Sequence, residues 1–259
     1  MPEGDTVYQA ANRLRAALAG EVLTRTDIRV PRYATLDLAG ETVDSVASRG
    51  KHLLIRVGEF TLHSHLKMEG AWRVFAPGER WNRPAFQARA VLTTADAVAV
   101  GFELGLFEVL ARSAEEDAVG YLGPDLLGTD WDAAEAERRI RNGPEVPIDV
   151  ALLDQRNLAG LGNVYANELC FLRGVRPQRP VAEVPDLPKV IDLGHRLITA
   201  NRDRIARVTT GVDRRGQRLW VYGRGGEPCR RCGTRIEQGE LGRVEGQERV
   251  TYWCPRCQT

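Results

Sequence analysis

The chain of 259 residues has no hydrophobic run long enough to cross a bilayer and no apolar leader after its first residue. These absences argue against membrane insertion and export, so we expect a cytoplasmic protein. Internal repeats and low-complexity segments are also absent, which excludes a repeat array. With 43% hydrophobic and 27% charged residues, the chain has the composition of a globular protein with one large domain or two smaller ones.

Charge is distributed unevenly along the chain. The net charge is only +1, but residues 201–259 hold 13 Arg or Lys against 7 Asp or Glu, a net charge of +6, and the first 200 residues carry −5. A basic segment on an acidic body is typical of proteins that bind a polyanion. A solvated arginine-rich surface is the alternative, and charge alone does not decide between them.

Four of the five cysteines form two Cys-x-x-Cys pairs separated by 21 residues. Such paired knuckles predict a structural zinc site, since four thiolates fill a tetrahedral metal and leave no position for substrate. Two disulfides are the alternative, which a cytosolic compartment disfavours. The fifth cysteine, Cys170, lies in an apolar run and is expected to be a buried core thiol. The predicted zinc ligands are Cys229, Cys232, Cys254 and Cys257.

Local patterns predict an α+β chain of two domains. After a helix over residues 7–18, short apolar and β-branched runs between turn residues are typical of a β-sandwich or barrel. The expected strands are residues 43–46, 52–57, 60–63, 72–75, 88–93, 98–102 and 106–110. An acidic, turn-rich stretch over residues 111–132 then indicates a linker. The expected helices that follow are residues 131–141, 148–153, 164–172 and 187–204.

The first residues offer an unusual nucleophile. If Met1 is removed, Pro2 becomes a free secondary amine, and an α-amino group has a pKa of roughly 7.7–8.0 against ~10.4 for lysine. Attack of that amine on a carbonyl-level carbon gives an iminium ion, a strong electron sink. Glu3 supplies a neighbouring carboxyl group. Taken alone, however, Pro at position 2 is common and usually marks only an ordinary processed terminus.

Three further features are ambiguous when taken singly. Residues 152–168 predict two helices joined by a glycine-rich turn, with the second helix starting near Asn163. Such a unit can bind a phosphodiester, and an ordinary helical hairpin is the alternative. Lys51 is either functional or a solvated strand end. Arg249, inside the zinc hairpin, is either functional or part of a structural salt bridge.

Together these features resemble the Fpg/Nei family of bifunctional DNA glycosylase/AP lyases, and most closely its endonuclease VIII branch of the actinobacterial type. The resemblance extends over essentially the whole chain, and the four motifs occur in the family's order. They are Met1-Pro2-Glu3-Gly4, Arg49-Gly50-Lys51, the helix–two-turn–helix element at residues 152–168 and the zinc finger at residues 226–259.

The resemblance implies a role for each matching residue. Pro2 is the nucleophile that attacks C1′ of a damaged nucleotide, and Glu3 is the acid/base residue. Lys51 assists β-elimination, Arg249 clamps phosphates and is linked to δ-elimination, and Asn163 binds a phosphate. These five residues are therefore the expected catalytic and phosphate-binding groups.

Some positions depart from the family pattern. Tyr121 stands where well-known members have a DNA-contacting arginine. Lys67, Met68 and Glu69 occupy the loop that fills the hole left by an extruded base, with Met68 as an apolar wedge. Residues 100–105 lack the Arg and Phe pair of the oxidised-purine branch, which favours oxidised pyrimidines as substrates.

The function implied by the resemblance is base-excision repair. The enzyme would remove oxidised bases through a Schiff base at Pro2 and cut the strand by β,δ-elimination. The expected partner is damaged DNA, with one structural Zn²⁺ per chain, no small-molecule cofactor, no membrane and a monomeric state. A non-catalytic nucleic-acid-binding zinc-ribbon protein and a β-sandwich interaction module with a zinc staple are the alternatives.

The resemblance also implies the domain limits. They are a catalytic β-sandwich over residues 1–118, a linker over residues 119–130, a helix–two-turn–helix DNA-binding domain over residues 131–211 and a four-cysteine zinc finger over residues 212–259.

Overall fold

The computed structural model describes residues 2–243, 246 and 248–259, and it separates into two compact units that meet in sequence between Tyr121 and Leu122. Met1, whose removal the predicted Pro2 amine requires, lies outside the described residues. Within the described part of the chain, no helix combines the length and the apolar character needed to span a bilayer.

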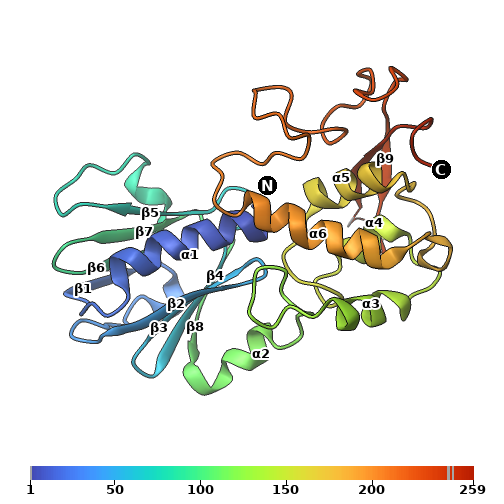
Figure 1. Ribbon diagram of the computed structural model, residues 1–259. Coiled ribbons are helices and arrows are strands. Elements are labelled where there is room, and N and C mark those ends of the chain that lie inside the picture. The colour runs from blue at the N-terminus through green and yellow to red at the C-terminus, as the bar shows by residue number, and fades with distance from the viewer. Residues whose placement is uncertain (1, 244–245, 247) are drawn as a thin grey trace. The chain divides into compact units, whose positions relative to one another are not determined.

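The N-terminal unit is a sandwich of two antiparallel sheets with one helix. Helix α1 (Gly4–Leu18) contacts β2 and β5, which are edge strands of the two sheets, so it covers that side of the sandwich (Figure 1). One sheet has the order β1 (Arg25–Ile28), β6 (Ala88–Thr93), β7 (Val98–Phe102), β5 (Ala71–Phe75). The other has the order β2 (Val43–Arg49), β3 (His52–Val57), β4 (Phe60–His65), β8 (Leu106–Ala111).

Successive side chains of β3 lie on opposite faces of its sheet. Leu53 and Ile55 join the main core of this unit, together with the buried face of α1 that includes Leu14. His52 and Arg56 lie on the opposite face of the sheet, because successive side chains of a strand alternate. The outer face of this sheet therefore carries polar side chains.

Residues 112–121 pack on this outer face. A short helix, α2 (Glu115–Val119), places Glu115 to accept hydrogen bonds from Arg56 Nε and Thr61 Oγ1, both at 2.8 Å. Arg56 holds the pKa of Glu115 below its ordinary value, so the carboxylate stays charged. Part of the stretch that the sequence indicated as a linker is thus helical and ion-paired to the sheet.

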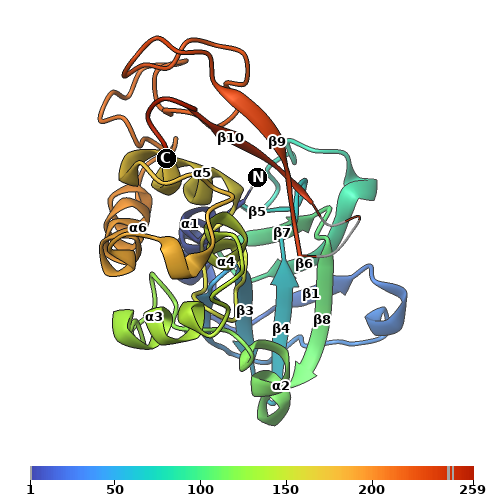
Figure 2. The ribbon, with the colours of Figure 1, turned by 90° about the vertical axis from the view of Figure 1, so that its right-hand side faces the viewer.

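The C-terminal unit begins with helices and ends in a hairpin. Its core packs α3 (Ala133–Arg141), α4 (Ile148–Leu153), α5 (Asn163–Arg173) and α6 (Leu187–Asn201). Strands β9 (Glu237–Leu241) and β10 (Arg249–Trp253) then pair antiparallel as a hairpin (Figure 2). The short 3-10 helices of the chain are η1 (Pro31–Tyr33), η2 (Ala85–Gln87), η3 (Arg112–Ala114) and η4 (Val181–Glu183).

Local chemistry explains where the helices of this unit begin and end. The Asp132 side chain caps α3 by accepting from the backbone N–H groups of Ala134 and Glu135. Helix α5 ends at Gly174, whose φ of 69° is the left-handed conformation that glycine adopts without strain. The predicted α+β class, with a leading helix, a β-sandwich, a helical domain and a cysteine-bearing hairpin, is confirmed.

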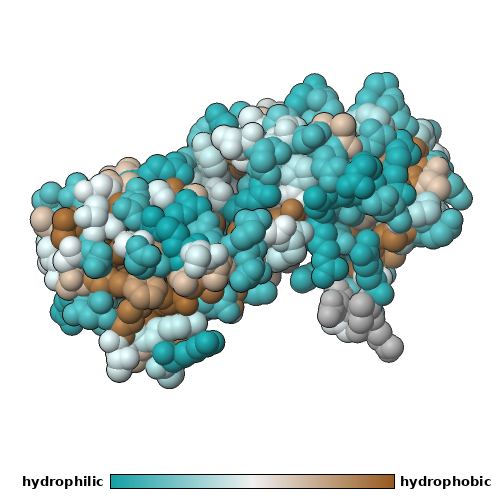
Figure 3. All heavy atoms as spheres, turned by 90° about the horizontal axis from the view of Figure 1, so that it is seen from below, coloured by the Kyte–Doolittle hydropathy of each residue, from teal (hydrophilic) through white to brown (hydrophobic). Residues whose placement is uncertain are grey.

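The two units differ in the surface they show on one face. In the view of Figure 3, apolar side chains gather on the sandwich unit, and the surface of the helical unit is mainly hydrophilic.

Candidate functional site

Pro2 and Glu3 are placed by the start of α1. Glu3 is the N-cap residue in an extended conformation (φ −123°), and its carbonyl accepts the backbone N–H of Val7 at 3.1 Å. Its side chain is fully buried, whereas Pro2 is partly exposed. The helix therefore fixes a buried carboxyl group next to the imino acid that the sequence predicts as nucleophile.

Lys51 owes its position to a two-residue hairpin turn. Arg49 pairs with His52 across β2 and β3, which leaves Gly50 and Lys51 as the turn. Gly50 has φ +56° at the first turn position, a conformation that a type II′ hairpin requires and other residues adopt with strain. The Arg-Gly-Lys motif thus places a partly exposed lysine at the tip of a rigid hairpin.

Tyr121 is the end of a hydrogen-bonded chain of side chains. Its hydroxyl lies 3.2 Å from His52 Nε2, His52 Nδ1 lies 2.7 Å from His63 Nε2, and His63 Nδ1 lies 3.1 Å from Glu108 Oε2. A carboxylate only accepts, so with neutral rings His63 donates from Nδ1, His52 donates from Nδ1, and the Tyr121 hydroxyl donates to His52. One acid thus assigns the tautomer of both histidines.

Two histidines at this end of the sheet, His52 and His65, are held neutral by their lowered pKa values. Burial, and to a smaller extent the neighbouring His63, lowers the pKa of His52 from 6.5 to about 3. Burial, assisted by Lys67 and Lys51, lowers the pKa of His65 to about 4. The structure therefore brings three predicted site residues, Lys51, Lys67 and Tyr121, around His52.

Met68 is presented by a tight loop after β4. The backbone N–H of Gly70 donates to Leu66 O at 2.9 Å, and Lys67 adopts φ +53°, so the chain reverses within residues 66–70. Lys67 N–H also donates to His65 Nδ1 at 2.9 Å. The Met68 side chain is 57% exposed at the tip, the placement that an apolar wedge needs.

In the C-terminal unit, α5 and β10 are joined through two asparagines. Asn163 is the first residue of α5, as expected, but it is buried, and its Nδ2 donates to Val250 O at 2.8 Å. Asn167 Oδ1 accepts the backbone N–H of Tyr252. These bonds fix β10, whose first residue is the exposed Arg249. The predicted phosphate ligand thus also holds the strand that carries the predicted phosphate clamp.

Glu168 organises the segment before the cysteines. Its carboxylate is fully buried and accepts the backbone N–H groups of Trp220 and Val221 at 2.8 Å and Tyr222 at 2.9 Å. It also accepts the Thr209 hydroxyl. One acid therefore satisfies three consecutive backbone donors in a stretch without helix or strand.

The four predicted cysteine ligands come together. All four sulfur atoms lie within 4.8 Å of one another, with 4.0 Å between Cys229 and Cys257 and 3.5 Å between Cys232 and Cys254. These separations exclude disulfides, whose S–S bond is about 2.05 Å. Tetrahedral Zn–S bonds of about 2.3 Å place sulfurs about 3.8 Å apart, so the donor set fits zinc. Cys170 is buried as expected, and burial raises the pKa of its thiol.

Sequence reasoning missed the residues that support the site. His52, His63 and Glu108 act only once β3, β4 and β8 are in register. A signal existed for the histidines, because three of the four in the chain lie within residues 52–65. Glu168 ended a recognised motif but gave no sign of its distant partners.

Two models of known protein families match the chain, one within each of its two compact units. The family model described as the formamidopyrimidine-DNA glycosylase N-terminal domain matches residues 1–103, and that of the formamidopyrimidine-DNA glycosylase H2TH domain matches residues 122–196.

Similar proteins match over the full length. A probable endonuclease 8 2 of Streptomyces coelicolor is 57% identical, covering 100% of this chain and 94% of its own. A DNA-(apurinic or apyrimidinic site) lyase Nei2 of Mycolicibacterium smegmatis is 55% identical, covering 100% and 99%. A solved complex of the Lactococcus lactis Fpg with abasic-site DNA matches with a TM-score of 0.82 and 23% identity, covering 99% of each chain, which establishes the fold.

Proposed function

Because the chain belongs to the family of formamidopyrimidine-DNA glycosylase and endonuclease 8, we propose that it is a bifunctional DNA glycosylase and AP lyase of base-excision repair. The observation that carries the proposal is the arrangement at the start of α1, where a buried carboxyl group adjoins the imino acid Pro2. Amine and acid are the two groups that Schiff-base chemistry at a sugar carbon needs.

The reaction follows from these groups. A stacked base is out of reach, so the nucleotide is first extruded at a cost of a few kcal/mol. The nitrogen lone pair of Pro2 attacks C1′, the bond from C1′ to the base breaks, and the base leaves with a proton. Glu3 protonates the opening sugar ring, which gives an iminium ion at C1′.

Strand cleavage uses the acidity that the iminium confers. Loss of a C2′ proton breaks the C3′–O bond and releases the 3′ phosphate, and a second elimination breaks the C5′–O bond and releases the 5′ phosphate. Water then hydrolyses the Schiff base and frees Pro2. In this proposal Lys51 supports the first elimination, while Arg249 and Asn163 bind phosphates and Arg249 supports the second.

We assign the cysteine cluster to one structural zinc ion. Four ligands close the coordination sphere, so the metal's contribution is to fold the finger that presents Arg249. Phe171 of α5 and Val221 share a small core with two of the cysteines, which supports a structural role.

The remaining features complete the proposal. Oxidised pyrimidines are the proposed lesions, since β7 and β8 are joined by only residues 103–105, without the Arg and Phe pair. Damaged DNA is contacted through Lys67, Met68 and Tyr121, and the protein acts as a cytoplasmic monomer. The proposed domain limits are those expected from the sequence, with the catalytic domain ending at residue 118, the linker at residue 130 and the helix–two-turn–helix domain at residue 211.

Trapping with borohydride tests the central step. Borohydride reduces the iminium to a stable amine, so protein with a mature Pro2 terminus should form a covalent adduct with abasic-site DNA. We expect Pro2→Gly to lower the adduct yield by at least tenfold, because glycine supplies only a primary amine in a different geometry. A fully active protein with a blocked Pro2 nitrogen, measured by mass spectrometry, would contradict the mechanism.

A non-catalytic nucleic-acid-binding protein is the second candidate, favoured only by the excess of arginine in residues 201–259. It predicts binding of abasic DNA without any adduct. Oligonucleotides carrying single oxidised pyrimidines or 8-oxoguanine then test the proposed lesion preference.

A further inference from the structure

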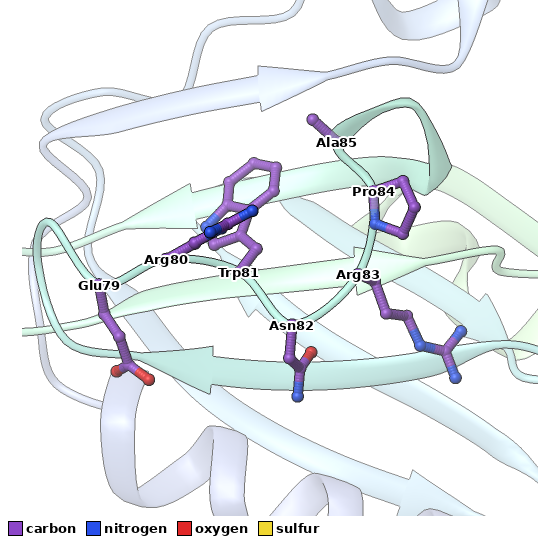
Figure 4. Close-up of a pocket in the computed structure, with 7 residues that line it drawn as sticks. All are labelled: Glu79, Arg80, Trp81, Asn82, Arg83, Pro84 and Ala85. Atoms are coloured by element: carbon purple, nitrogen blue, oxygen red, sulfur yellow. The ribbon is translucent and has the colours of Figure 1, made fainter.

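Three connections of the N-terminal unit are tied together by one arginine. Arg83 belongs to the segment between β5 and β6 that lines a hollow of about 720 Å³ (Figure 4). Its side chain points away from Trp81, and Nη1 donates to Glu69 O at 3.1 Å and to Glu103 Oε2 at 3.2 Å. One guanidinium nitrogen therefore links the loop that carries Met68 to the turn between β7 and β8.

The loop of residues 66–70 and the turn between β7 and β8 pack so closely that Gly70 and Gly105 leave no room for a Cβ atom. A Cβ at Gly70 would lie only 3.0 Å from Glu103 O, and one at Gly105 would overlap the stem of Lys67. Glu103 and Lys67 both adopt left-handed backbone conformations, with φ of 46° and 53°. Two strained residues facing each other persist only where surrounding contacts hold them.

We propose that Arg83 is a positioning residue, which fixes the loop of residues 66–70 so that Met68 can fill the hole left by an extruded base. The inference rests on the proposed function and deepens it. A wedge separates stacked bases only if its own backbone resists displacement, because unstacking costs a few kcal/mol per step. Met68 is exposed at the tip, so its resistance must come from the backbone beneath it.

Arg83 has a second effect through charge. Glu103 and Glu69 place two carboxylates near the loop, and both would repel DNA phosphates. The ion pair with Arg83, at 3.2 Å, compensates Glu103 and keeps the carboxylate turned to the loop. Loss of Arg83 thus loosens the wedge and exposes a negative charge together.

The test compares two substrates. Filling the hole is needed in a duplex, whereas a single-stranded oligonucleotide with a ready-made abasic site has no stack to open. We expect Arg83→Ala to lower kcat/KM on a lesion-bearing duplex by about tenfold or more, the loss typical of a charge-assisted hydrogen bond. Cleavage of the single-stranded abasic substrate should stay within about twofold of the unmodified protein.

Arg80→Ala is the matched control. Arg80 is an exposed arginine of the same segment, so its removal costs the same charge and the same general attraction to DNA. It should leave the ratio of duplex to single-strand activity unchanged. Arg83→Lys, which keeps the charge without the planar guanidinium, should give an intermediate ratio.

Hydrogen exchange supplies a readout without DNA. The Gly70 amide, bonded to Leu66 O at 2.9 Å, should exchange faster in Arg83→Ala than in Arg80→Ala. Equal losses on both substrates, or an unchanged ratio, would overturn the positioning role. Absence of any adduct between the unmodified protein and abasic DNA, whether duplex or single-stranded, would instead refute the proposed function itself.

Discussion

The two units hold their candidate residues by different means. In the N-terminal unit, Lys51 sits on a two-residue turn that the ladder between β2 and β3 fixes. Met68 sits on the tight loop of residues 66–70 that links β4 of one sheet to β5 of the other. In the C-terminal unit, residues 202–236, all described, form no helix or strand between α6 and β9. There the buried carboxylate of Glu168 and the cysteine cluster satisfy and fix the backbone instead. Where regular hydrogen bonding ends, a few polar groups carry the structure.

Removal of the proposed zinc ion should give the largest difference in stability between the two units. Structural zinc contributes apparent free energies of about 10–16 kcal/mol in finger peptides, as large as the whole net stability of a typical domain, which is about 5–15 kcal/mol. Chelation, or Cys254→Ser, should therefore unfold residues 221–259 and leave residues 2–121 protected, as hydrogen exchange would measure. Exchange rising equally in both units would show that the finger is not the metal-dependent part.

Glu168→Gln tests the buried carboxylate that accepts the backbone N–H groups of residues 220–222. The amide would direct N–H groups at backbone donors that now meet carboxylate oxygens, leaving buried groups unpaired. We expect the C-terminal unit to lose about 3 kcal/mol of unfolding free energy, measured by chemical denaturation. Glu145→Gln, an exposed acid of the same unit, is the control and should change little. A small effect of Glu168→Gln would mean that the stability of the unit does not depend on the buried carboxylate.

Acid should act on the N-terminal unit gradually, over several pH units. The pKa values of His52 and His65 lie near 3 and 4 in the fold, below the ordinary 6.5, so the unfolded chain takes up protons first. Stability is complete above pH 6.5 and falls on acidification by up to about 1.4 kcal/mol per pH unit for each histidine.

The matched variants are His52→Gln and His195→Gln. The first should flatten the loss of stability between about pH 6 and pH 4, while His195, stacked on Trp131 in the other unit, should leave the slope of the N-terminal unit unchanged. Thermal or urea unfolding across that range measures both. A slope that His52→Gln does not alter would place the acid sensitivity elsewhere.

Much of the fold could be predicted from the sequence because turn residues delimit short strands. The predicted bounds of β3, β6 and β7 agree with the structure, and the family resemblance, including the endonuclease VIII branch, is confirmed by relatives of up to 57% identity. Strand β1 was missed because Arg25–Ile28 is polar and does not alternate. Helix α2 was missed because five residues show no helical period.

The site could be predicted only as far as local patterns reach. Cysteine spacing predicted the four cysteines that the fold brings together, and the motifs pointed to Pro2, Lys51 and Asn163 as candidates. The contact of Asn163 with Val250 spans 87 residues, and that of Arg83 with Glu103 depends on three connections meeting. Such partners follow from tertiary packing, which no short motif encodes. The roles assigned to the site residues stay predictions for the trapping and loop experiments.

The orientation of the Tyr121 hydroxyl limits which groups of DNA this residue can bind. With the tautomers that Glu108 assigns to the neutral rings, the Tyr121 hydroxyl donates its proton to His52 Nε2, so the oxygen offers only lone pairs to a further partner. Phosphodiester oxygens are acceptors too, and two acceptors repel. Tyr121 is thus suited to stacking its half-exposed ring on a nucleobase, or to receiving an exocyclic amino group, and not to replacing an arginine at the backbone.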